Sequence, residues 1–316
     1  MRWSPPGGSP RAPLWYHDRV LVLIAIPGSE ACARDLGARL GARVIEPEIR
    51  QFPDGELYVR VDPRGGGIDV ELGSDVAIVG NLSGDSFLRV AFLAGTVRDL
   101  GARRVGLVAP YLAYMRQDSR FRPGEGVTAR YFARLVSSTV DWLVTVDPHL
   151  HRIDSLAGVY TIPTTVARAA PAIARWIAAE VDQPVLVGPD AESVQWVSAV
   201  AERCGAPFLI LEKTRLGDRD VSISAPDGAW NGHTPVVIDD IVSTGRTMIE
   251  ATRQLRAAGS APPMCVAIHA VFADALHDAL LDAGARGIVT CDTIPHVTNR
   301  ICVAEPLADA VRERMG

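Results

Sequence analysis

The sequence predicts an α/β protein built from two doubly wound parallel-sheet domains. Short, almost continuously apolar segments alternate with longer alanine-rich segments of helical length. This alternation is typical of parallel strands that are buried between helices on both faces of a sheet. It occurs twice along 316 residues, a length that accommodates two such domains.

The first half contains four apolar segments that are rich in β-branched residues and separated by helical stretches. Segments of this length and composition predict buried strands. The predicted strands are 20–26, 75–80, 103–110 and 141–147, and the predicted helices are 29–40, 85–100 and 128–139.

The second half repeats the pattern, with helical stretches between five further apolar segments. A doubly wound sheet is again predicted, because strands and helices alternate along the chain. The predicted strands are 184–190, 207–212, 235–240, 264–272 and 287–292.

Glycine and proline interrupt the pattern around residues 155–165, and the domain boundary is predicted there. We expect a flexible tail at 1–19, a first domain at 20–160 and a second domain at 161–303. The amphipathic segment 304–316 predicts a final helix that packs back on the first domain.

The composition excludes several kinds of partner. The formal net charge is −5, whereas nucleic acids and anionic membranes favour a basic surface. Every apolar segment is too short to span a bilayer, and the start of the chain lacks the apolar core of a signal peptide. The five cysteines show no Cys-x-x-Cys spacing, which argues against a disulfide framework or a zinc site. We therefore expect a cytoplasmic protein without a nucleic-acid or membrane partner.

The most informative segment is 236–255, where an apolar strand leads into a small, hydroxyl-rich turn. Asp239 and Asp240 lie at the carboxyl end of the strand, where open α/β sheets bind ligands. The turn opens a helix, whose free N–H groups and dipole favour a phosphate. It consists of Ser243, Thr244, Gly245, Arg246 and Thr247.

Two carboxylates beside a phosphate turn suit a vicinal diol, because each oxygen can accept a hydroxyl proton. The segment therefore predicts a site for ribose that carries a 5-phosphate. The alternative is a purely structural strand–turn–helix in which Ser and Thr cap the helix.

This pattern of two aspartates followed by Thr-Gly-x-Thr resembles the PRPP-binding signature of type I phosphoribosyltransferases. Segments 52–61 and 109–135 resemble the ATP-contacting segments of ribose-phosphate pyrophosphokinases, although 52–61 alone also predicts a simple hairpin turn. The resemblance extends over nearly the whole chain from about residue 20 and implies a phosphoribosyltransferase-like fold in both domains. It implies that ATP is contacted by Phe52, Asp54, Gly55, Glu56, Arg116, Gln117 and Asp118.

The resemblance also assigns metal and catalytic residues. His149 matches the family histidine that helps to hold Mg-ATP, and Asp190 matches its acidic partner, so Mg²⁺ is the implied cofactor; His151 is a competing candidate. Segment 211–224 resembles the family's mobile catalytic loop, in which Lys213 and Arg215 match two basic residues. Two flexible cations there would stabilise a transferred phosphoryl group, and Arg215 is also expected to contact ribose 5-phosphate.

The lysine at 213 stands out, because the chain contains thirty-one arginines and one lysine. The sequence also departs from the family pattern. Ala191, Glu192 and Ser193 follow Asp190 where small, glycine-rich residues are usual, and Glu192 would add negative charge near a phosphate. No P-loop or GxGxxG motif is present, which excludes a P-loop kinase and a dinucleotide-binding fold.

The resemblance implies an enzyme that transfers the β,γ-diphosphoryl group of Mg-ATP to the 1-hydroxyl of ribose 5-phosphate, giving PRPP and AMP. It also implies a homo-oligomer in which the loop at 52–56 completes the ATP site of a neighbouring subunit. Two alternatives stay open: a phosphoribosyltransferase that consumes PRPP, and a catalytically silent regulatory subunit. A silent relative should have lost Lys213 or the two aspartates, and all three are present.

Overall fold

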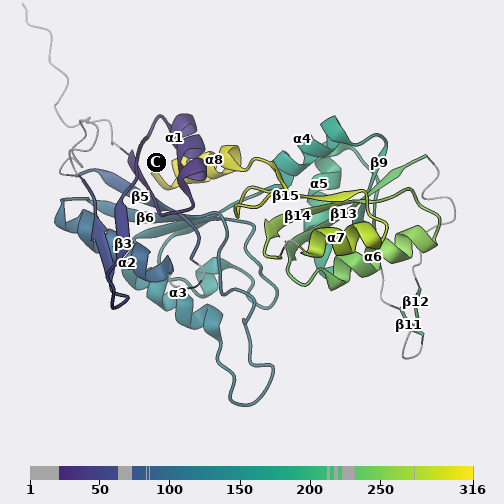
Figure 1. Cartoon of the computed structure of the whole chain (residues 1–316), viewed down its shortest axis with the longest axis horizontal. Coiled ribbons are helices and arrows are strands. Elements are labelled where there is room, and N and C mark those ends of the chain that lie inside the picture. The colour runs from purple at the N-terminus through teal and green to yellow at the C-terminus, as the bar shows by residue number, and fades with distance from the viewer. Residues whose placement is uncertain are drawn as a thin grey trace, which may run out of the picture.

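The computed structural model describes residues 21–62, 73–82, 84, 86–211, 214–216, 220–222, 232–273 and 275–315. Within these ranges the chain forms two lobes that lie side by side, each built around a six-stranded sheet (Figure 1). Every pair of neighbouring strands in both large sheets is parallel, which confirms the predicted α/β fold with two parallel sheets.

The sheet of the first lobe has the strand order β2-β1-β5-β6-β7-β8. Alternate residues of β1 point to opposite faces, so that Leu23 packs with α1 and α8 while Val22 and Ile24 pack with α2 and α3. The strands are β1 (Leu21–Ala25), β2 (Arg43–Ile45), β5 (Asp75–Val79), β6 (Arg104–Ala109), β7 (Trp142–Val146) and β8 (Thr164–Ala167); the helices are α1 (Glu30–Leu40), α2 (Ser86–Asp99), α3 (Thr128–Thr139) and α8 (Ala304–Met315).

The sheet of the second lobe has the order β10-β9-β13-β14-β15-β16. Helices α4 and α5 cover one face, and α6 and α7 cover the other. The strands are β9 (Pro184–Gly188), β10 (Phe208–Ile210), β13 (Thr234–Val242), β14 (Met264–Ala270), β15 (Gly287–Cys291) and β16 (Asn299–Ile301); the helices are α4 (Ala170–Glu180), α5 (Val194–Cys204), α6 (Arg246–Ala257) and α7 (Ala275–Asp282).

Two antiparallel hairpins and two short 3-10 helices complete the described elements. The hairpin β3 (Glu48–Gln51) and β4 (Leu57–Arg60) extends from the first lobe, and its tip lies away from the second lobe (Figure 1). The hairpin β11 (Thr214–Leu216) and β12 (Asp220–Ser222) extends from the second lobe. The 3-10 helices are η1 (Leu156–Gly158) and η2 (Ala191–Ser193).

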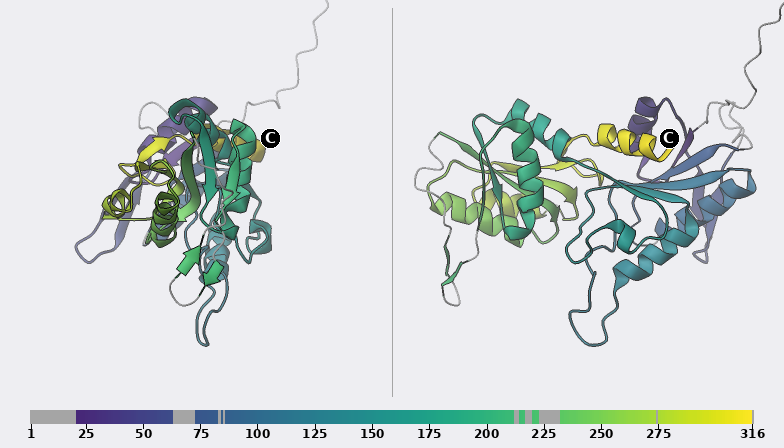
Figure 2. Two further views of the ribbon diagram at one scale, coloured as in Figure 1. Left: turned by 90° about the vertical axis from the view of Figure 1, so that its right-hand side faces the viewer. Right: turned by 180° about the vertical axis from the view of Figure 1, so that it is seen from behind.

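The last helix, α8, returns from the second lobe to the first and lies against α1, β7 and β8 (Figure 2). Strand β8 pairs with β7, so the crossover from one sheet to the other follows Ala167, a few residues beyond the boundary expected at 160. One continuous apolar cluster contains side chains from α1 and α8 together with side chains from α4 and α5. The two lobes therefore share a core, which fixes the cleft between them.

Within the described ranges, no helix combines the length and apolar character that crossing a membrane requires.

Candidate functional site

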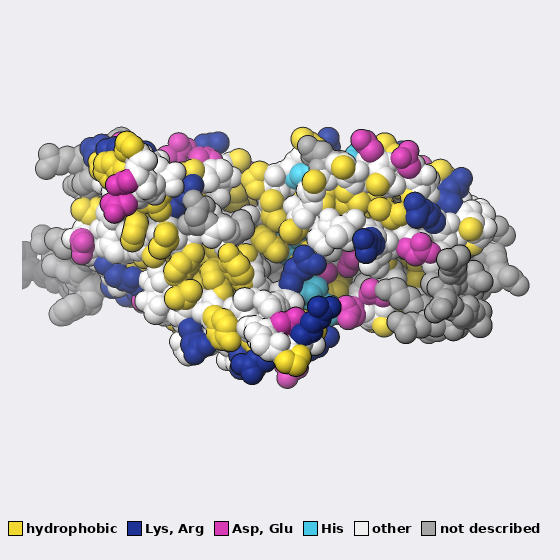
Figure 3. Space-filling model, turned by 60° about the horizontal axis from the view of Figure 1, so that its bottom comes forward, with side chains coloured by type: hydrophobic (Ala, Val, Ile, Leu, Met, Phe, Trp, Pro, Cys, Tyr) yellow, Lys and Arg dark blue, Asp and Glu magenta, His cyan; other side chains and the backbone are white. Residues whose placement is uncertain are grey.

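The carboxyl end of strand β13 and the loop after β7 face each other across a cleft between the lobes. Figure 3 shows basic, acidic and histidine side chains gathered in this region. The cavity has a volume of about 260 Å³. It is lined by Arg116, His149 and His151 from the first lobe and by Asp190, Glu192, Trp196, Asp239, Asp240 and residues 241–248 from the second.

The predicted phosphate turn lies in this cleft. Strand β13 extends to Val242, and α6 begins at Arg246, so the turn is short and ends at the helix N-terminus. Gly245 has a φ of +70°, a left-handed conformation that favours glycine. A Cβ at this position would lie 1.9 Å from the Leu276 side chain, so glycine is also required for space. The predicted residues Ser243, Thr244, Gly245, Arg246 and Thr247 all line the cavity.

The two aspartates of β13 differ in the direction in which their surroundings shift the pKa. Burial, together with the neighbouring carboxylates of Asp240 and Asp190, raises the pKa of Asp239 to about 8. Burial also opposes charge on Asp240, but the hydrogen bond and the charge of His149 outweigh it and hold the pKa of Asp240 below its ordinary value. Asp239 therefore holds a proton more readily than Asp240 does.

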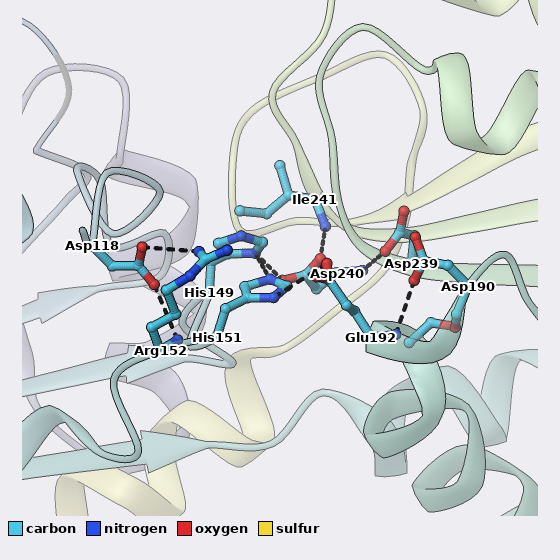
Figure 4. Close-up of polar contacts among 10 residues, drawn as sticks. Asp118, His149, His151, Arg152, Asp190, Glu192, Asp239, Asp240 and Ile241 are labelled. Carbon is cyan, nitrogen blue, oxygen red and sulfur yellow. Dashed lines mark hydrogen bonds and ion pairs between the residues drawn. The ribbon is translucent and has the colours of Figure 1, made fainter. Parts of the chain in front are cut away.

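A chain of polar contacts crosses the cleft from one lobe to the other (Figure 4). His149 Nδ1 lies 2.6 Å from Asp240 Oδ2, and His151 Nε2 lies 3.2 Å from His149 Nδ1. The other nitrogen of His151, Nδ1, lies 3.2 Å from Glu192 Oε2. Asp190 accepts a hydrogen bond from the Glu192 backbone N–H at 3.1 Å.

The loop after β6 supplies one predicted ATP-contacting residue to the cleft. Arg116 lines the cavity and donates a hydrogen bond to Ser243 Oγ at 3.2 Å. Asp118 instead accepts from the backbone N–H and the guanidinium of Arg152, and the Gln117 carbonyl accepts from the Ala129 N–H. The structure therefore places Arg116 in the cleft and directs Asp118 to a structural contact.

The remaining predicted ATP residues, Phe52, Asp54, Gly55 and Glu56, lie at the tip of the β3–β4 hairpin and do not line this cavity. The tip is ordered by a hydrogen bond from the Phe52 N–H to the Glu56 carbonyl at 2.8 Å. The Arg50 guanidinium lies over the rings of Phe52 and Tyr58, at 4.8 Å and 4.1 Å from their centroids.

Of the two predicted catalytic residues, the structure describes Arg215. Lys213 lies outside the described residues. Arg215 belongs to β11, where its backbone pairs with Val221.

Hydrogen bonds that the sequence did not reveal also join the lobes beside the cleft. His269 Nε2 donates to the Asp147 carbonyl at 3.1 Å, and Asn81 Nδ2 donates to the Thr293 carbonyl at 2.8 Å. Asp147 itself has an unusual φ of +27° and accepts from the Ala169 N–H and from Arg168. These contacts hold the turn that carries His149, and no local sequence motif marks them.

A divalent cation fits the donor set in the cleft. His149 Nδ1, one ring nitrogen of His151 and one Asp240 carboxylate oxygen all lie within 4.8 Å of one another. Asp190, the acidic partner expected for His149, lines the same cavity but is not one of these three residues.

Two family models match the chain. The model described as the N-terminal domain of ribose phosphate pyrophosphokinase matches residues 21–139, and the phosphoribosyl transferase domain matches residues 163–308.

Curated relatives match along almost their full length. A ribose-phosphate pyrophosphokinase from Methanopyrus kandleri is 34% identical over 301 residues, which is 94% of this chain and 100% of the relative. One from Thermoplasma acidophilum is 32% identical over 290 residues, which is 92% of this chain and 98% of the relative.

A solved structure has the same fold. The phosphoribosylpyrophosphate synthetase from Mycobacterium smegmatis superimposes with a TM-score of 0.79 at 25% identity, covering 94% of this chain and 99% of that one. The expected phosphoribosyltransferase-like fold of both domains is thereby confirmed.

Proposed function

This chain belongs to the ribose-phosphate pyrophosphokinase family, and we propose that it transfers the β,γ-diphosphoryl group of ATP to the 1-hydroxyl of ribose 5-phosphate, giving PRPP and AMP. The observation that carries the proposal is the juxtaposition of a phosphate turn and two carboxylates at the carboxyl end of β13. Both features face the first lobe, which contributes Arg116 and His149.

The sugar would be held by β13 and the turn that follows it. Backbone N–H groups at the start of α6 suit the 5-phosphate, because a helix N-terminus favours an anion. Each of the two carboxylates can accept a hydrogen bond from a ribose hydroxyl, and Asp239, whose pKa is raised, can also donate one when it is protonated. This arrangement directs the 1-hydroxyl into the cleft, toward the first lobe.

The chemistry would rely on positioning and charge stabilisation, as is usual for phosphoryl-type transfer. The 1-hydroxyl attacks the β-phosphorus of ATP in line, and AMP leaves. Arg116 lies in the cleft and can pair with a phosphate, while Lys213 and Arg215 would stabilise the negative charge that develops on the transferred group. Magnesium, when bound with ATP, neutralises phosphate charge, and His149 and Asp190 are the residues expected to hold it.

The hairpin tip needs a second subunit to take part. Phe52 and Glu56 lie away from their own cleft, so an ATP-contacting role places them in the site of a neighbouring copy. An apolar surface on the first lobe supports self-association: Leu88 and Phe92 on α2 and Tyr131 and Leu135 on α3 are 43–50% exposed. Figure 3 shows apolar side chains gathered over this lobe.

A cytoplasmic setting fits the free state of all five cysteines.

Incubation of the pure protein with ATP, magnesium and ribose 5-phosphate tests the proposal. AMP and PRPP should form in equal amounts and only when all three components are present. Pyrophosphate release from PRPP that depends on a nucleobase and not on ATP would instead identify a phosphoribosyltransferase. No turnover in either assay would identify a silent subunit.

A further inference from the structure

We propose that the cleft binds a first-row transition-metal cation more tightly than Mg²⁺, through His149, His151 and Asp240, with Glu192 as the residue that orients His151. The inference deepens the proposed function, since the cation would lie in the same cleft as the substrates. It makes His151, a competing candidate in the sequence, a ligand beside His149, and it gives Glu192 a supporting role that the sequence did not indicate. The inference rests on the geometry of the four side chains (Figure 4).

The distances match those between neighbouring ligands of one ion. Ligand atoms about 2.1 Å from a metal lie about 3.0 Å apart in an octahedral site and about 3.4 Å apart in a tetrahedral one. His149 Nδ1 and His151 Nε2 are separated by 3.2 Å, within this interval. His149 Nδ1 and Asp240 Oδ2 form a hydrogen bond of 2.6 Å. An ion could replace this hydrogen bond if the two atoms moved apart by about 0.4 Å.

Glu192 has the position of a carboxylate that supports a metal-binding histidine. Such a histidine usually donates its other ring N–H to a carboxylate, which fixes the tautomer and the ring orientation. His151 Nδ1 lies 3.2 Å from Glu192 Oε2, while its Nε2 faces His149 and Asp240. A proton on Nδ1 leaves the lone pair of Nε2 directed at the other two ligand atoms.

The ligands come from both lobes and from separate elements. His149 and His151 follow β7 in the first lobe, whereas Asp240 lies on β13 and Glu192 on η2 in the second. His151 is largely buried, at 15% exposure, so its ring is held in the cleft rather than free in solvent. An ion at this point would therefore tie the two lobes together.

The donor types determine the cation. Mg²⁺ prefers oxygen ligands and binds few protein groups, whereas imidazole suits later first-row metals. Two imidazole nitrogens and one carboxylate oxygen therefore favour a cation such as Co²⁺ or Zn²⁺ over Mg²⁺.

Co²⁺ titration of metal-free, tag-free protein without nucleotide tests the inference, with visible absorption as the readout. One Co²⁺ per chain should bind, and an equal concentration of Mg²⁺ should not displace it. Glu192→Gln should weaken Co²⁺ binding about 10–100-fold, as for other carboxylates behind a ligand histidine. His151→Asn should weaken it at least as much.

His277→Asn is the matched control. His277 lies 3.6 Å from Asp278 on α7 and is about half exposed, so it offers an imidazole beside a carboxylate outside the cleft. The control should bind Co²⁺ like the wild type, and melting curves should show that all three variants are folded. Unchanged Co²⁺ affinity in Glu192→Gln and His151→Asn, or equal competition by Mg²⁺, would overturn the inference.

The ATP assay separates this inference from the proposed function. PRPP synthesis with magnesium, but no Co²⁺ absorption, would reject the transition-metal site and leave the enzyme activity standing. Co²⁺ absorption that depends on His151 without any PRPP synthesis would support the metal site and reject the activity.

Discussion

Lys213 is the residue whose chemical type matters most to the proposed reaction. An ammonium group is a compact point charge that can follow a bridging oxygen, whereas guanidinium is a wide planar fork. We expect Lys213→Ala to lower kcat by about 10²–10⁴, as for other lost contacts to a transition state. KM values should change much less.

Lys213→Arg should recover only a small part of this loss, because Arg215 can already supply a guanidinium. Steady-state kinetics of both variants decide the question, with melting curves as the control for folding. Near-wild-type turnover of the arginine variant would show that the lone lysine follows composition and not chemistry.

Gly245 is a second residue with a testable requirement, since the Leu276 side chain occupies the space that a Cβ would need. Gly245→Ala should raise KM for ribose 5-phosphate at least about 10-fold, because the alanine Cβ would displace the turn. Gly259→Ala is the matched control. Gly259 also has a positive φ, of +81°, but nothing lies within 4 Å of a Cβ there.

The control should show only the cost of the backbone conformation, about 1–2 kcal/mol of stability, with KM unchanged. Equal KM values for the two alanine variants would remove the turn from the sugar-phosphate site.

Strands β5 and β6 are joined at their starts by a buried ionic contact between Asp75 and two arginines. The Asp75 carboxylate is fully buried and lies 2.8 Å from Arg103 and 2.9 Å from Arg104. Burial would raise its pKa, but hydrogen bonds from Arg104 and Arg103 outweigh burial and lower it. The stabilisation is therefore present above the ordinary pKa of about 3.8 and is lost as pH falls through the lowered value.

Asp75→Asn should lower the free energy of unfolding by about 1–3 kcal/mol at pH 7. Asp75→Asn leaves Arg103 and Arg104 without their carboxylate partner. The loss of stability should still be smaller than for a fully buried unpaired charge, because both arginines also contact solvent. Glu46→Gln is the control, since the Arg34–Glu46 pair is exposed on both sides and should contribute less than about 1 kcal/mol. Urea unfolding of the two variants measures the difference; similar values would show that the buried contact has no special weight.

The elements that the sequence predicted are those that a local pattern specifies. Strand β13 and the turn after it could be predicted, because the apolar segment, the two aspartates and the hydroxyl residues are adjacent in sequence. Strands β8 and β16 have four and three residues, which is too short to give a pattern of their own. Only their pairing with β7 and β15 makes them strands.

The contacts across the cleft could not be predicted, because they depend on how the lobes meet. The family resemblance pairs His149 with Asp190 for the metal, and it does not indicate the contact that the His149 ring makes with the Asp240 carboxylate. Glu192 was interpreted as a charge that opposes phosphate binding, and in the folded chain it lies beside His151.

At the scale of the whole molecule, the junction between the lobes contains a buried histidine that should make stability depend on pH. His269 is fully buried, and burial lowers its pKa from 6.5 to about 4. The unfolded chain takes up this proton near pH 6.5, while the folded chain does so only near pH 4. The stabilisation is therefore complete above pH 6.5 and declines as pH falls toward 4, by up to about 1.4 kcal/mol per pH unit.

His269→Gln should reduce this dependence, so that the free energy of unfolding falls less between pH 6.5 and pH 4.5 than in the wild type. Urea unfolding at several pH values measures both slopes. His277→Gln, an exposed histidine on α7, should leave the slope unchanged. Identical slopes in the wild type and the His269 variant would show that another group controls acid stability.

Subunit mixing can show whether the hairpin of one copy completes the active site of another. The hairpin tip lies away from its own cleft, so Phe52 and Glu56 can serve catalysis only in a neighbouring copy. A chain with Lys213→Ala keeps an intact hairpin, and a chain with Phe52→Ala and Glu56→Ala keeps an intact catalytic loop. Each should be nearly inactive alone, because every one of its sites lacks one component.

Mixing the two variants should restore activity if subunits exchange. For a hairpin that reaches across a two-fold interface, random pairing of equal amounts leaves about one quarter of the sites with both components intact. Mixing the Lys213→Ala chain with a chain that carries all three substitutions is the control, and it should restore nothing. The rate of PRPP formation after mixing is the measurement. Two results would place the hairpin outside the active site of its neighbour. One is a fully active monomer at assay concentration. The other is a mixture in which subunits have been shown to exchange but whose rate is no higher than the sum of the two separate rates.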